Sequence, residues 1–254
     1  MRWSEHVCVL EGPDLVIAAL EADAEFEALF VDTSAAGRAD LVEIVARATA
    51  RGVRAFGLDP AVLAKVADAQ TPQPISATVR FATPALSAMA TGALTLVLHD
   101  LRDPGNVGTI IRSADAAGVG AVILTGQSVD PYNPKTLRAT AGSIFHVPVG
   151  VGDLDATLEH FERAGSHTWA TVVRGGTELL DCDLSGPSVV VIGNEADGLD
   201  AATIDRCQSS LSIAMAGTNE SLNAGVAASL VSFVAYWQRV GRVAPPIPRS
   251  LGES

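Results

Sequence analysis

The sequence is poor in cysteine and has no long apolar run, and each shortage excludes a class of protein. The three cysteines, Cys8, Cys182 and Cys207, are odd in number and widely spaced, which argues against a disulfide framework or a zinc site and favours reduced thiols. The five histidines are scattered as well, so we expect no metal. Without an apolar run of about 18 residues or a basic-then-apolar N-terminus, we expect a soluble, cytoplasmic protein with no membrane partner.

Positive charge is also scarce. The chain has 17 lysines and arginines against 29 acidic residues, a net charge of −12, and only Lys65 and Lys135 are lysines. Nucleic-acid binding usually leaves a basic footprint, because affinity comes largely from phosphate neutralisation. The overall charge therefore does not indicate RNA, and a local patch of arginines, which suit bidentate phosphate recognition, would have to supply the binding.

What the sequence has is a regular alternation of apolar patterns, with an apolar fraction of 48% that predicts well-formed cores. Residues 1–82 predict a small α/β domain, followed by a linker at 83–93. The predicted strands are 6–10, 28–31, 53–58 and 78–81, and the predicted helices are 13–22, 38–50 and 60–69.

Residues 94–244 predict a second α/β domain, and the proline-containing segment 245–254 predicts a flexible tail. Strands and helices alternate, which favours a mostly parallel sheet with helices on both faces. The predicted strands are 94–99, 121–124, 145–149, 168–173, 189–192 and 211–214, and the predicted helices are 107–117, 134–141, 154–164 and 222–239.

Three segments of this domain each place glycine, asparagine and a charged or hydroxyl residue just after a predicted strand. They are 103–108 with Arg112 on the following helix, then 193–198, then 219–223. Loops at the carboxyl ends of parallel strands carry the chemistry of α/β proteins. We therefore expect the three segments to form one composite site.

The first segment also has a simpler interpretation when it is taken alone. Asn106 suits the cap of a helix start, and Asp115 lies one turn beyond Arg112, where the two would form a surface ion pair. The alternative partner of Arg112 is Glu195, across a cleft, which would orient the guanidinium.

The other two segments leave alternatives open as well. The residues around Glu195 are typical of an acidic turn before a helix, and Asn219 or Ser221 would serve as a helix cap. A nicotinamide site is disfavoured because the fingerprint G-x-G-x-x-G is absent. No G-x-S-x-G elbow surrounds Ser221, which disfavours a hydrolase nucleophile.

Together with residues 134–142, the segments 103–112, 189–199 and 211–228 resemble the motifs of the SpoU (TrmH) family of RNA 2′-O-ribose methyltransferases, in the SPOUT superfamily. The resemblance implies a parallel-sheet α/β trefoil-knot domain preceded by a smaller, ribosomal-protein-like α/β domain. Knots are otherwise almost absent from proteins. The small side chains of 224–229 fit a helix that packs closely against a threaded backbone.

The resemblance also implies a cofactor and its site. Members of the family bind S-adenosylmethionine in the knot, mainly through backbone atoms. Mapped by motif, the contacts are Gly193, Ile213 and Leu222, with Thr140 and Met215 nearby.

The family's catalytic positions fall on Asn106, Arg112, Glu195, Ser221 and Asn223. Members are homodimers through the knot domain, and Arg112 is expected to reach into the partner's site. An arginine at this position has been proposed as the base, but a guanidinium with a pKa above about 12 is a poor base at neutral pH. We favour Arg112 orienting a phosphate and stabilising alkoxide charge.

The N-terminal domain resembles the substrate-binding domain of many family members, which is similar to a ribosomal protein that binds kinked RNA. It lacks the usual basic helix before the first strand. Arg51, Arg54 and Arg80 are the candidate phosphate contacts there, with Lys135 and Arg138 in the second domain. Their alternative role is solubilising charge.

Two functions remain open. The first is S-adenosylmethionine-dependent methyl transfer to a ribose 2′-hydroxyl of structured RNA, ribosomal rather than transfer RNA. The second is a non-catalytic RNA-binding or ribosome-assembly protein that keeps the knot fold.

Overall fold

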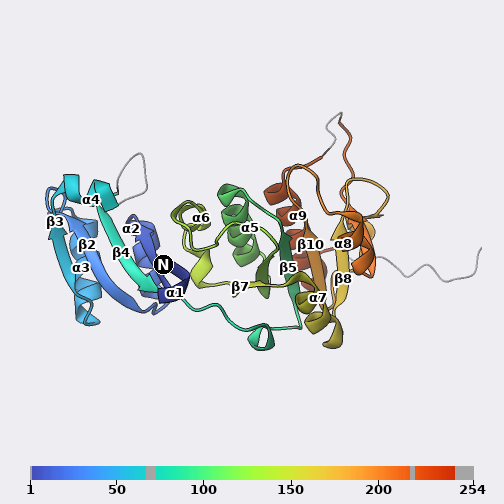
Figure 1. The fold of residues 1–254 in the computed structure, drawn as a ribbon, viewed down its shortest axis with the longest axis horizontal. Helices are drawn as coiled ribbons and strands as arrows, with labels where there is room; N and C mark the ends of the chain where they lie inside the picture. The colour runs from blue at the N-terminus through green and yellow to red at the C-terminus, as the bar shows by residue number, and fades with distance from the viewer. Residues whose placement is uncertain (1, 67–72, 218–220, 244–254) are drawn as a thin grey trace, which may run out of the picture. The chain divides into compact units, whose positions relative to one another are not determined.

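The computed structural model describes residues 2–66, 73–217 and 221–243, which form two compact units (Figure 1). The first unit comprises the chain up to Thr83 together with Asp130–His146, and the second comprises Pro84–Val129 and the chain from Val147 onward. The predicted division placed residues 130–146 in the second domain, whereas their contacts group them with the first unit. The predicted tail, 245–254, lies outside the described residues. No helix in the described part of the chain is long and apolar enough to cross a membrane.

The first unit is built on a four-stranded mixed sheet with the order β1-β4-β2-β3. Strand β4 runs antiparallel to β1 and β2, and β3 runs parallel to β2. The elements are α1 (Arg2–Glu5), β1 (Val7–Glu11), α2 (Pro13–Glu21), β2 (Phe26–Asp32), α3 (Ala39–Ala50), β3 (Ala55–Leu58), α4 (Pro60–Val66), β4 (Ile75–Arg80), α6 (Pro134–Thr140) and the 3-10 turn η2 (Ser143–Phe145).

Two contacts explain why residues 130–146 pack with the first unit. Arg138 donates to the carboxylate of Glu11 at 2.8 Å, and that carboxylate is almost completely buried. Tyr132 stacks on Phe81 with ring centroids 3.8 Å apart. A buried carboxylate is costly without a partner, so the ion pair makes α6 part of this unit's structure.

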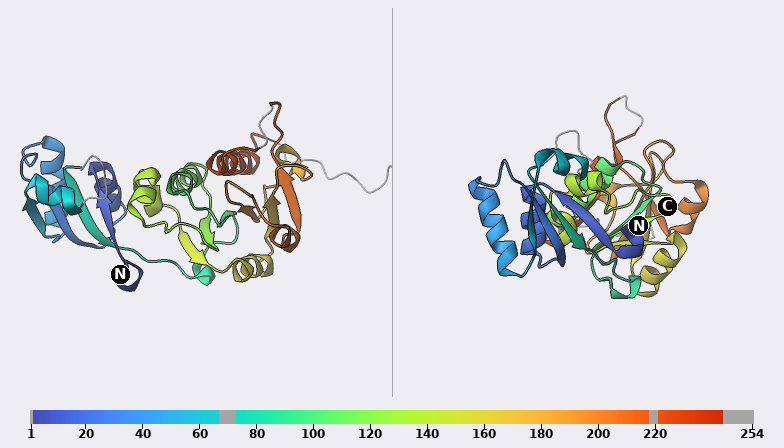
Figure 2. Two further views of the ribbon diagram at one scale, coloured as in Figure 1. Left: turned by 45° about the horizontal axis from the view of Figure 1, so that its top comes forward. Right: turned by 60° about the vertical axis from the view of Figure 1, so that its left-hand side comes forward.

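The second unit contains a seven-stranded sheet with the order β7-β6-β5-β10-β8-β11-β9, and every strand pair in it is parallel. Helices α5 and α9 lie side by side on one face, and α7 covers the other (Figures 1 and 2). The elements are η1 (Leu86–Ala88), β5 (Leu94–His99), α5 (Pro104–Ala116), β6 (Ala121–Thr125), β7 (Val149–Gly152), α7 (Leu154–Arg163), β8 (His167–Thr171), β9 (Thr177–Glu178), η3 (Leu179–Asp181), β10 (Ser188–Ile192), α8 (Ala201–Arg206), β11 (Ser209–Ser212) and α9 (Ala224–Arg239).

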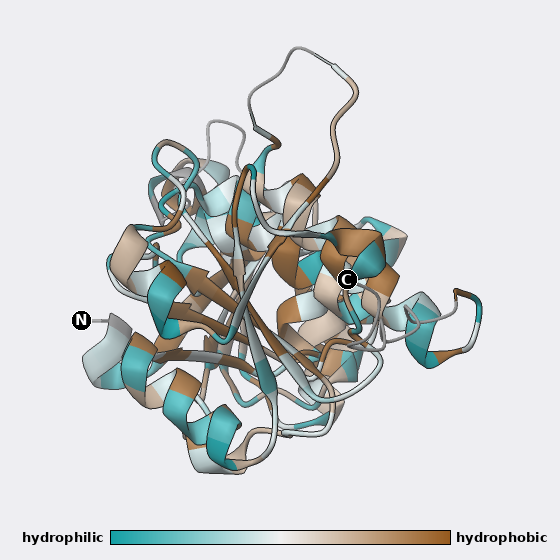
Figure 3. Cartoon of the chain, turned by 90° about the vertical axis from the view of Figure 1, so that its right-hand side faces the viewer, coloured by the Kyte–Doolittle hydropathy of each residue, from teal (hydrophilic) through white to brown (hydrophobic). Residues whose placement is uncertain are grey.

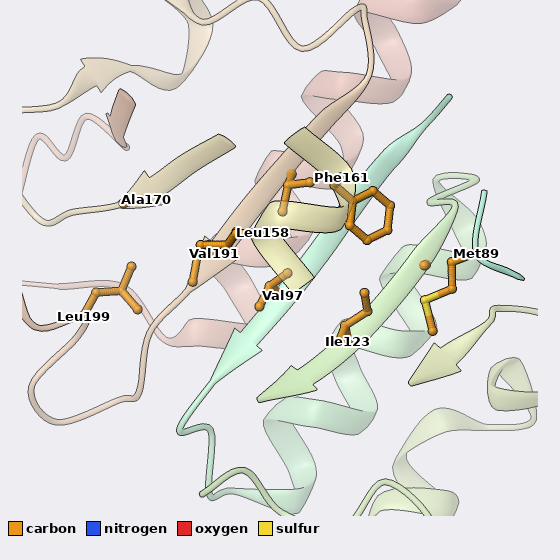
Figure 4. Packing of buried hydrophobic residues seen from close by; sticks show 10 residues of the cluster. Met89, Val97, Ile123, Leu158, Phe161, Ala170, Val191 and Leu199 are labelled. Carbon is orange, nitrogen blue, oxygen red and sulfur yellow. The ribbon is translucent and has the colours of Figure 1, made fainter. Parts of the chain in front are cut away.

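The core beneath α7 is hydrophobic and mostly aliphatic. Leu158 and Phe161 of α7 pack on Val97 of β5 and Val191 of β10, and Met89 closes one side (Figure 4). Hydrophobic residues gather on several strands in the interior, whereas the helices alternate between hydrophilic and hydrophobic residues (Figure 3). This contrast is expected of a sheet buried on both faces.

Several sequence predictions need correction at their boundaries. The predicted strand 145–149 is wrong, because Phe145 ends the turn η2 and β7 begins at Val149; Pro148 has no N–H to donate and contributes only its carbonyl, which accepts from the Val122 amide of β6 at 2.9 Å. The predicted strand 211–214 begins and ends two residues earlier, at Ser209–Ser212. The short strand β9 was not predicted. The parallel α/β architecture itself is confirmed.

An ion pair between α7 and α8 makes the stability of the second unit depend on pH. Arg206 donates to both carboxylate oxygens of Glu162 at 3.0 and 3.1 Å, which holds the pKa of that carboxyl below its ordinary 4.5. Because the pKa is lower in the folded than in the unfolded state, the stabilisation is complete well above pH 4.5. It is lost as the pH falls through the folded pKa.

Replacing Glu162 with glutamine is expected to lower the free energy of unfolding by about 1–2 kcal/mol at neutral pH. The difference from wild type should vanish in acid, where the wild-type carboxyl is also neutral. Urea denaturation of both proteins at stepped pH values measures this. The matched control is E159Q on the same helix, whose exposed pair with Arg163 contributes little. A pH-independent loss, or an equal loss in the control, would contradict the assignment.

Candidate active site

A cavity of about 270 Å³ opens at the carboxyl edge of the parallel sheet. The strand ends Thr171 of β8, Ile192 of β10 and Leu211 of β11 reach it, and the loops after these strands form its walls. Parallel strands bring these loops to one edge by their topology alone. The lining residues are Thr171, Val172, Val173, Ile192, Gly193, Asn194, Glu195, Ala196, Asp197, Gly198, Leu199, Ile204, Leu211, Ile213, Met215, Ser221, Leu222, Ala224 and Ala227.

The loop after β10 is folded tightly against itself. A Cβ atom at Gly193 would lie 2.4 Å from the carbonyl carbon of Gly198, so no side chain fits there. The Asn194 side chain accepts hydrogen bonds from the amides of Ala196 and Asp197, both at 2.8 Å. Leu199 then returns into the hydrophobic core beside Val191 (Figure 4). The loop is therefore anchored at both ends and exposes bare backbone to the cavity.

A chain of three polar side chains links the cavity to both helices on one face of the sheet. Asn106, in the first turn of α5, donates to Glu195 at 2.7 Å. Asn223 donates to the Asn106 oxygen at 2.9 Å, and its own oxygen accepts from the amides of Gly225 and Val226 at the start of α9. The three residues predicted from separate segments thus meet in one network.

The two helices approach closely behind this network. The hydroxyls of Ser113 and Ser229 are 2.7 Å apart, joining α5 to α9. A Cβ atom at Gly225 would lie 3.4 Å from a Thr109 methyl and 3.5 Å from the Asn106 oxygen. Small residues at this contact allow the close packing that the sequence predicted for α9.

Four of the five predicted cofactor residues lie at the cavity, and one does not. Gly193, Ile213, Met215 and Leu222 all line it. Thr140 belongs to the first unit, is fully buried, and donates its hydroxyl to the Leu137 carbonyl at 2.7 Å. Thr140 is not among the residues that line the cavity.

The predicted catalytic residues divide into three groups. Glu195 and Ser221 line the cavity, and Asn106 and Asn223 are bonded to Glu195 directly or through one step. Arg112 is exposed on α5 and is absent from the lining. Glu195 bonds to Asn106 rather than to Arg112, so the structure does not show the pairing of Arg112 with Glu195 that the sequence offered as an alternative.

The helix caps also differ from the sequence interpretation. Asp103, rather than Asn106, caps α5 by accepting from the Asn106 amide at 2.7 Å. Asn223, rather than Ser221, caps α9. Asn219, the other predicted cap, lies outside the described residues. Both asparagine side chains are therefore available to the network. Asn106 does not cap a helix, whereas Asn223 caps α9 with its oxygen and donates to Asn106 with its nitrogen.

Asp200 caps α8 just beyond the cavity wall. Its carboxylate accepts from the Thr203 amide at 2.8 Å, which holds the pKa of Asp200 below its usual range. This carboxylate is therefore ionised at neutral pH and is occupied in ending the loop after β10.

Three of the five predicted RNA contacts are engaged with carboxylates of the same unit. Arg51 pairs with Asp23 at 3.0 Å, Arg80 with Glu27 at 2.5 Å, and Arg138 with Glu11. The other two, Arg54 and Lys135, are exposed, and Arg54 lies 6.0 Å from the ring centre of Phe56. The structure thus gives Arg138 a structural role and leaves Arg54 and Lys135 available.

Sequence reasoning missed one wall of the cavity. Thr171 lines it from the end of β8, and Val172 and Val173 line it from the loop that follows, whereas the pattern extended the strand through residue 173. The doublet Gly175-Gly176 was the available signal for an earlier strand end.

Comparison with known proteins gives two matches to families of domains. Residues 93–233 match the sequence model of the SpoU rRNA Methylase family, and residues 1–77 match that of the MRM3-like substrate binding domain. The first match covers more than half of the chain and contains every residue that lines the cavity.

Individual relatives point the same way. The chain is 31% identical over 232 residues to the 23S rRNA (guanosine(2553)-2′-O)-methyltransferase RlmP of Bacillus subtilis, covering 91% of this chain and 89% of the relative. It is 38% identical over 148 residues to a 23S rRNA (uridine(2479)-2′-O)-methyltransferase of Streptomyces viridochromogenes, covering 56% of this chain and 52% of that one.

Solved structures are similar in fold over nearly the whole chain. The SpoU methyltransferase AviRb of Streptomyces viridochromogenes, in complex with the cofactor AdoMet, superposes with a TM-score of 0.83 at 28% identity, covering 94% of this chain and 92% of that one. An AdoMet-bound rRNA methyltransferase of Sinorhizobium meliloti has a TM-score of 0.81 at 29% identity, with coverage of 94% and 89%.

Proposed function

Since the chain belongs to the SpoU rRNA methylase family, we propose that it transfers a methyl group from S-adenosylmethionine to a ribose 2′-hydroxyl of structured RNA, ribosomal rather than transfer RNA. One observation carries the proposal. The cavity at the carboxyl edge is lined by Gly193, Ile213, Met215 and Leu222 together with Glu195 and Ser221, residues of two separate motifs.

The residues of the cavity fit the cofactor. Apolar side chains of Ile192, Leu199 and Ile213 suit a flat heterocycle, and the backbone around Gly193 suits hydrogen bonds that need no side chain. Glu195 and Asp197 give the cavity negative charge suited to a sulfonium and an ammonium group. When bound, S-adenosylmethionine supplies an electrophilic methyl group.

The chain's own residues would align the reacting hydroxyl. Glu195 accepts a hydrogen bond from Asn106, which in turn accepts one from Asn223, so the carboxylate is held at the cavity by a side-chain network. In-line displacement depends strongly on alignment, so such a fixed carboxylate is a suitable positioning group. Arg112 supplies a permanent positive charge for a phosphate or a developing alkoxide.

Homodimerisation through the second unit is part of the proposal. Arg112 lies outside the lining of the cavity, so it acts only if it reaches another subunit's site. An apolar stripe on α9, formed by Val226, Leu230, Phe233 and Trp237, repeats at helical spacing, and three of its members are 39–47% exposed. An exposed apolar stripe next to α5 supports a second copy as its partner.

We also propose that the second unit contains the trefoil knot that the resemblance to the family implies.

Ribosomal RNA is favoured by the relatives that span both units. RlmP and AviRb each match at least nine-tenths of this chain, and RlmP is named for 23S rRNA. The N-terminal unit, matched to a substrate binding domain, supports recognition of an extended RNA surface. A non-catalytic RNA-binding role is the alternative, but it leaves the Asn106–Glu195 network without a purpose.

The experiment that tests the function has two measurements on the purified full-length protein. Calorimetry is expected to show S-adenosylmethionine binding, and tritiated cofactor is expected to label unmodified 23S rRNA transcribed in vitro. Mapping of 2′-O-methyl positions in the product identifies the nucleotide. Cofactor binding without labelling of ribosomal or transfer RNA would support the non-catalytic alternative, and no binding at millimolar cofactor would contradict both the enzyme and its site.

A further inference from the structure

The arginines of the second unit differ in whether their charge is already neutralised. Arg163 and Arg206 pair with glutamates, and Arg239 donates to the carbonyls of Ser185 and Gly186. Arg102 and Arg174, in contrast, are exposed, and among the described residues their side chains make no hydrogen bond or ion pair. In a chain of net charge −12, where carboxylates outnumber basic side chains, exposed arginines that make no ion pair are unexpected.

The topology places these two arginines on either side of the loop after β10. Arg102 follows β5 and Arg174 follows β8, and these are the two strands that pair with β10, whose loop carries Glu195. Because all three strands are parallel, their loops emerge at the same edge. Two strand spacings separate β5 from β8, about 10 Å.

The backbone on either side of Arg102 is held in place. The Leu101 amide donates to the Ser128 hydroxyl at 3.0 Å, and its carbonyl accepts from Val129 at 2.8 Å. Asp103 on the other side caps α5. Arg102 therefore projects from a fixed point, and only its side chain is free to move.

The loop that carries Arg174 is held in the same way. The Val172 amide donates to the Leu211 carbonyl at 2.9 Å, and a Cβ atom at Gly176 would lie 2.7 Å from the Leu211 carbonyl carbon. The loop is thus fixed against β11 on both sides of Arg174. Val173, the residue before it, lines the cavity.

The loop after β10, which lies between the strands that lead to the two arginines, is negative. Glu195 and Asp197 both line the cavity and are exposed. This charge suits a cationic cofactor but repels a polyanion, so an RNA strand that brings a ribose to the cavity needs cations beside it. Guanidinium groups bind phosphate oxygens in a bidentate manner.

We infer that Arg102 and Arg174 form a phosphate-binding pair that holds the RNA backbone on the two sides of the reacting nucleotide. This inference rests on the proposed function. It adds two binding residues that are distinct from Arg112, which lies along α5 rather than at the edge loops.

Salt dependence of RNA binding tests the pair. For single-stranded RNA, each lost phosphate contact lowers the slope of log affinity against log salt by about 0.7, so R102A/R174A should lose about 1.4 and bind about 10-fold more weakly at low salt. The probe is unmodified 23S rRNA transcribed in vitro, measured by filter binding with the full-length protein. R102K/R174K should keep the wild-type slope, because charge is retained.

The matched control is R163A, which removes an arginine already paired with Glu159 on α7. Calorimetry of S-adenosylmethionine separates the inference from the proposed function, since neither arginine lines the cavity and the double variant should bind cofactor as wild type does. Unchanged slope and affinity in R102A/R174A would overturn the inference while leaving the enzyme intact. A wild-type protein that binds cofactor but not RNA would overturn it as well, and so would equal losses in R163A.

Discussion

Replacing Arg112 with alanine is expected to lower kcat for RNA methylation by about 10²–10³-fold, the effect of removing a preorganised charge from a developing oxyanion. S-adenosylmethionine binding should be unchanged, because Arg112 is absent from the lining of the cavity. Single-turnover methyl transfer with saturating RNA measures the chemical step. R163A on α7 is the control for loss of one surface arginine, and near-wild-type transfer by R112A would remove Arg112 from the site.

Mixed dimers show where Arg112 acts. In a heterodimer of R112A with E195A, one site keeps the intact Glu195 of the first chain and receives Arg112 from the second. If Arg112 crosses the interface, a tag-purified heterodimer should therefore recover about half of the wild-type activity, since one of two sites is whole. If it acts within its own chain, neither site is whole, and no recovery would contradict the crossed arrangement.

Replacing Gly193 with alanine is expected to weaken S-adenosylmethionine binding by at least about 10-fold, because overpacking strain of about 1–3 kcal/mol must be relieved by moving the loop. The new Cβ would lie 2.4 Å from the Gly198 carbonyl carbon and 2.6 Å from the Leu199 nitrogen. These are backbone atoms of the cavity wall, so relief displaces the surface that contacts the cofactor. Isothermal calorimetry measures the change.

The control for this substitution is G186A in the same unit. A Cβ atom there has no atom within 4 Å, and the Gly186 backbone does not have a positive φ. The control is expected to bind cofactor as wild type does. If G193A also binds it unchanged, the loop after β10 is not the cofactor's contact surface.

The buried strands were the most predictable part of the fold. The run Leu94–His99 was predicted at its observed bounds, because an unbroken apolar run flanked by turn residues has few alternatives. The predicted strand limits were wrong beside Pro148, where a single residue without an N–H precedes the start of β7. The strand Thr177–Glu178 was missed because it is only two residues long. Strand propensity averaged over several neighbouring residues detects neither a single proline nor a two-residue strand.

The sequence predicted which segments form the candidate site, but it did not predict which side chains are hydrogen-bonded to one another there. Motif spacing identified Asn106, Glu195 and Asn223, yet the only partner that the sequence suggested for Glu195 was Arg112, as one of two alternatives. The same limit applies to Arg138, whose bond to Glu11 joins residues 127 positions apart. Such partners are selected by tertiary packing, which determines which side chains meet and leaves no local pattern.

The Asn106–Glu195 and Asn223–Asn106 bonds span 89 and 117 positions of the chain, and this separation constrains when the site forms during synthesis. Strand β10 joins the sheet between β5 and β8, and α9 is the last of the helices in the described residues to leave the ribosome. Contacts of such long range form slowly, because loop closure precedes any gain from pairing. A nascent chain therefore cannot complete the network of Asn106, Glu195 and Asn223 until the start of α9 has emerged, so the proposed site matures late in the translation of this domain.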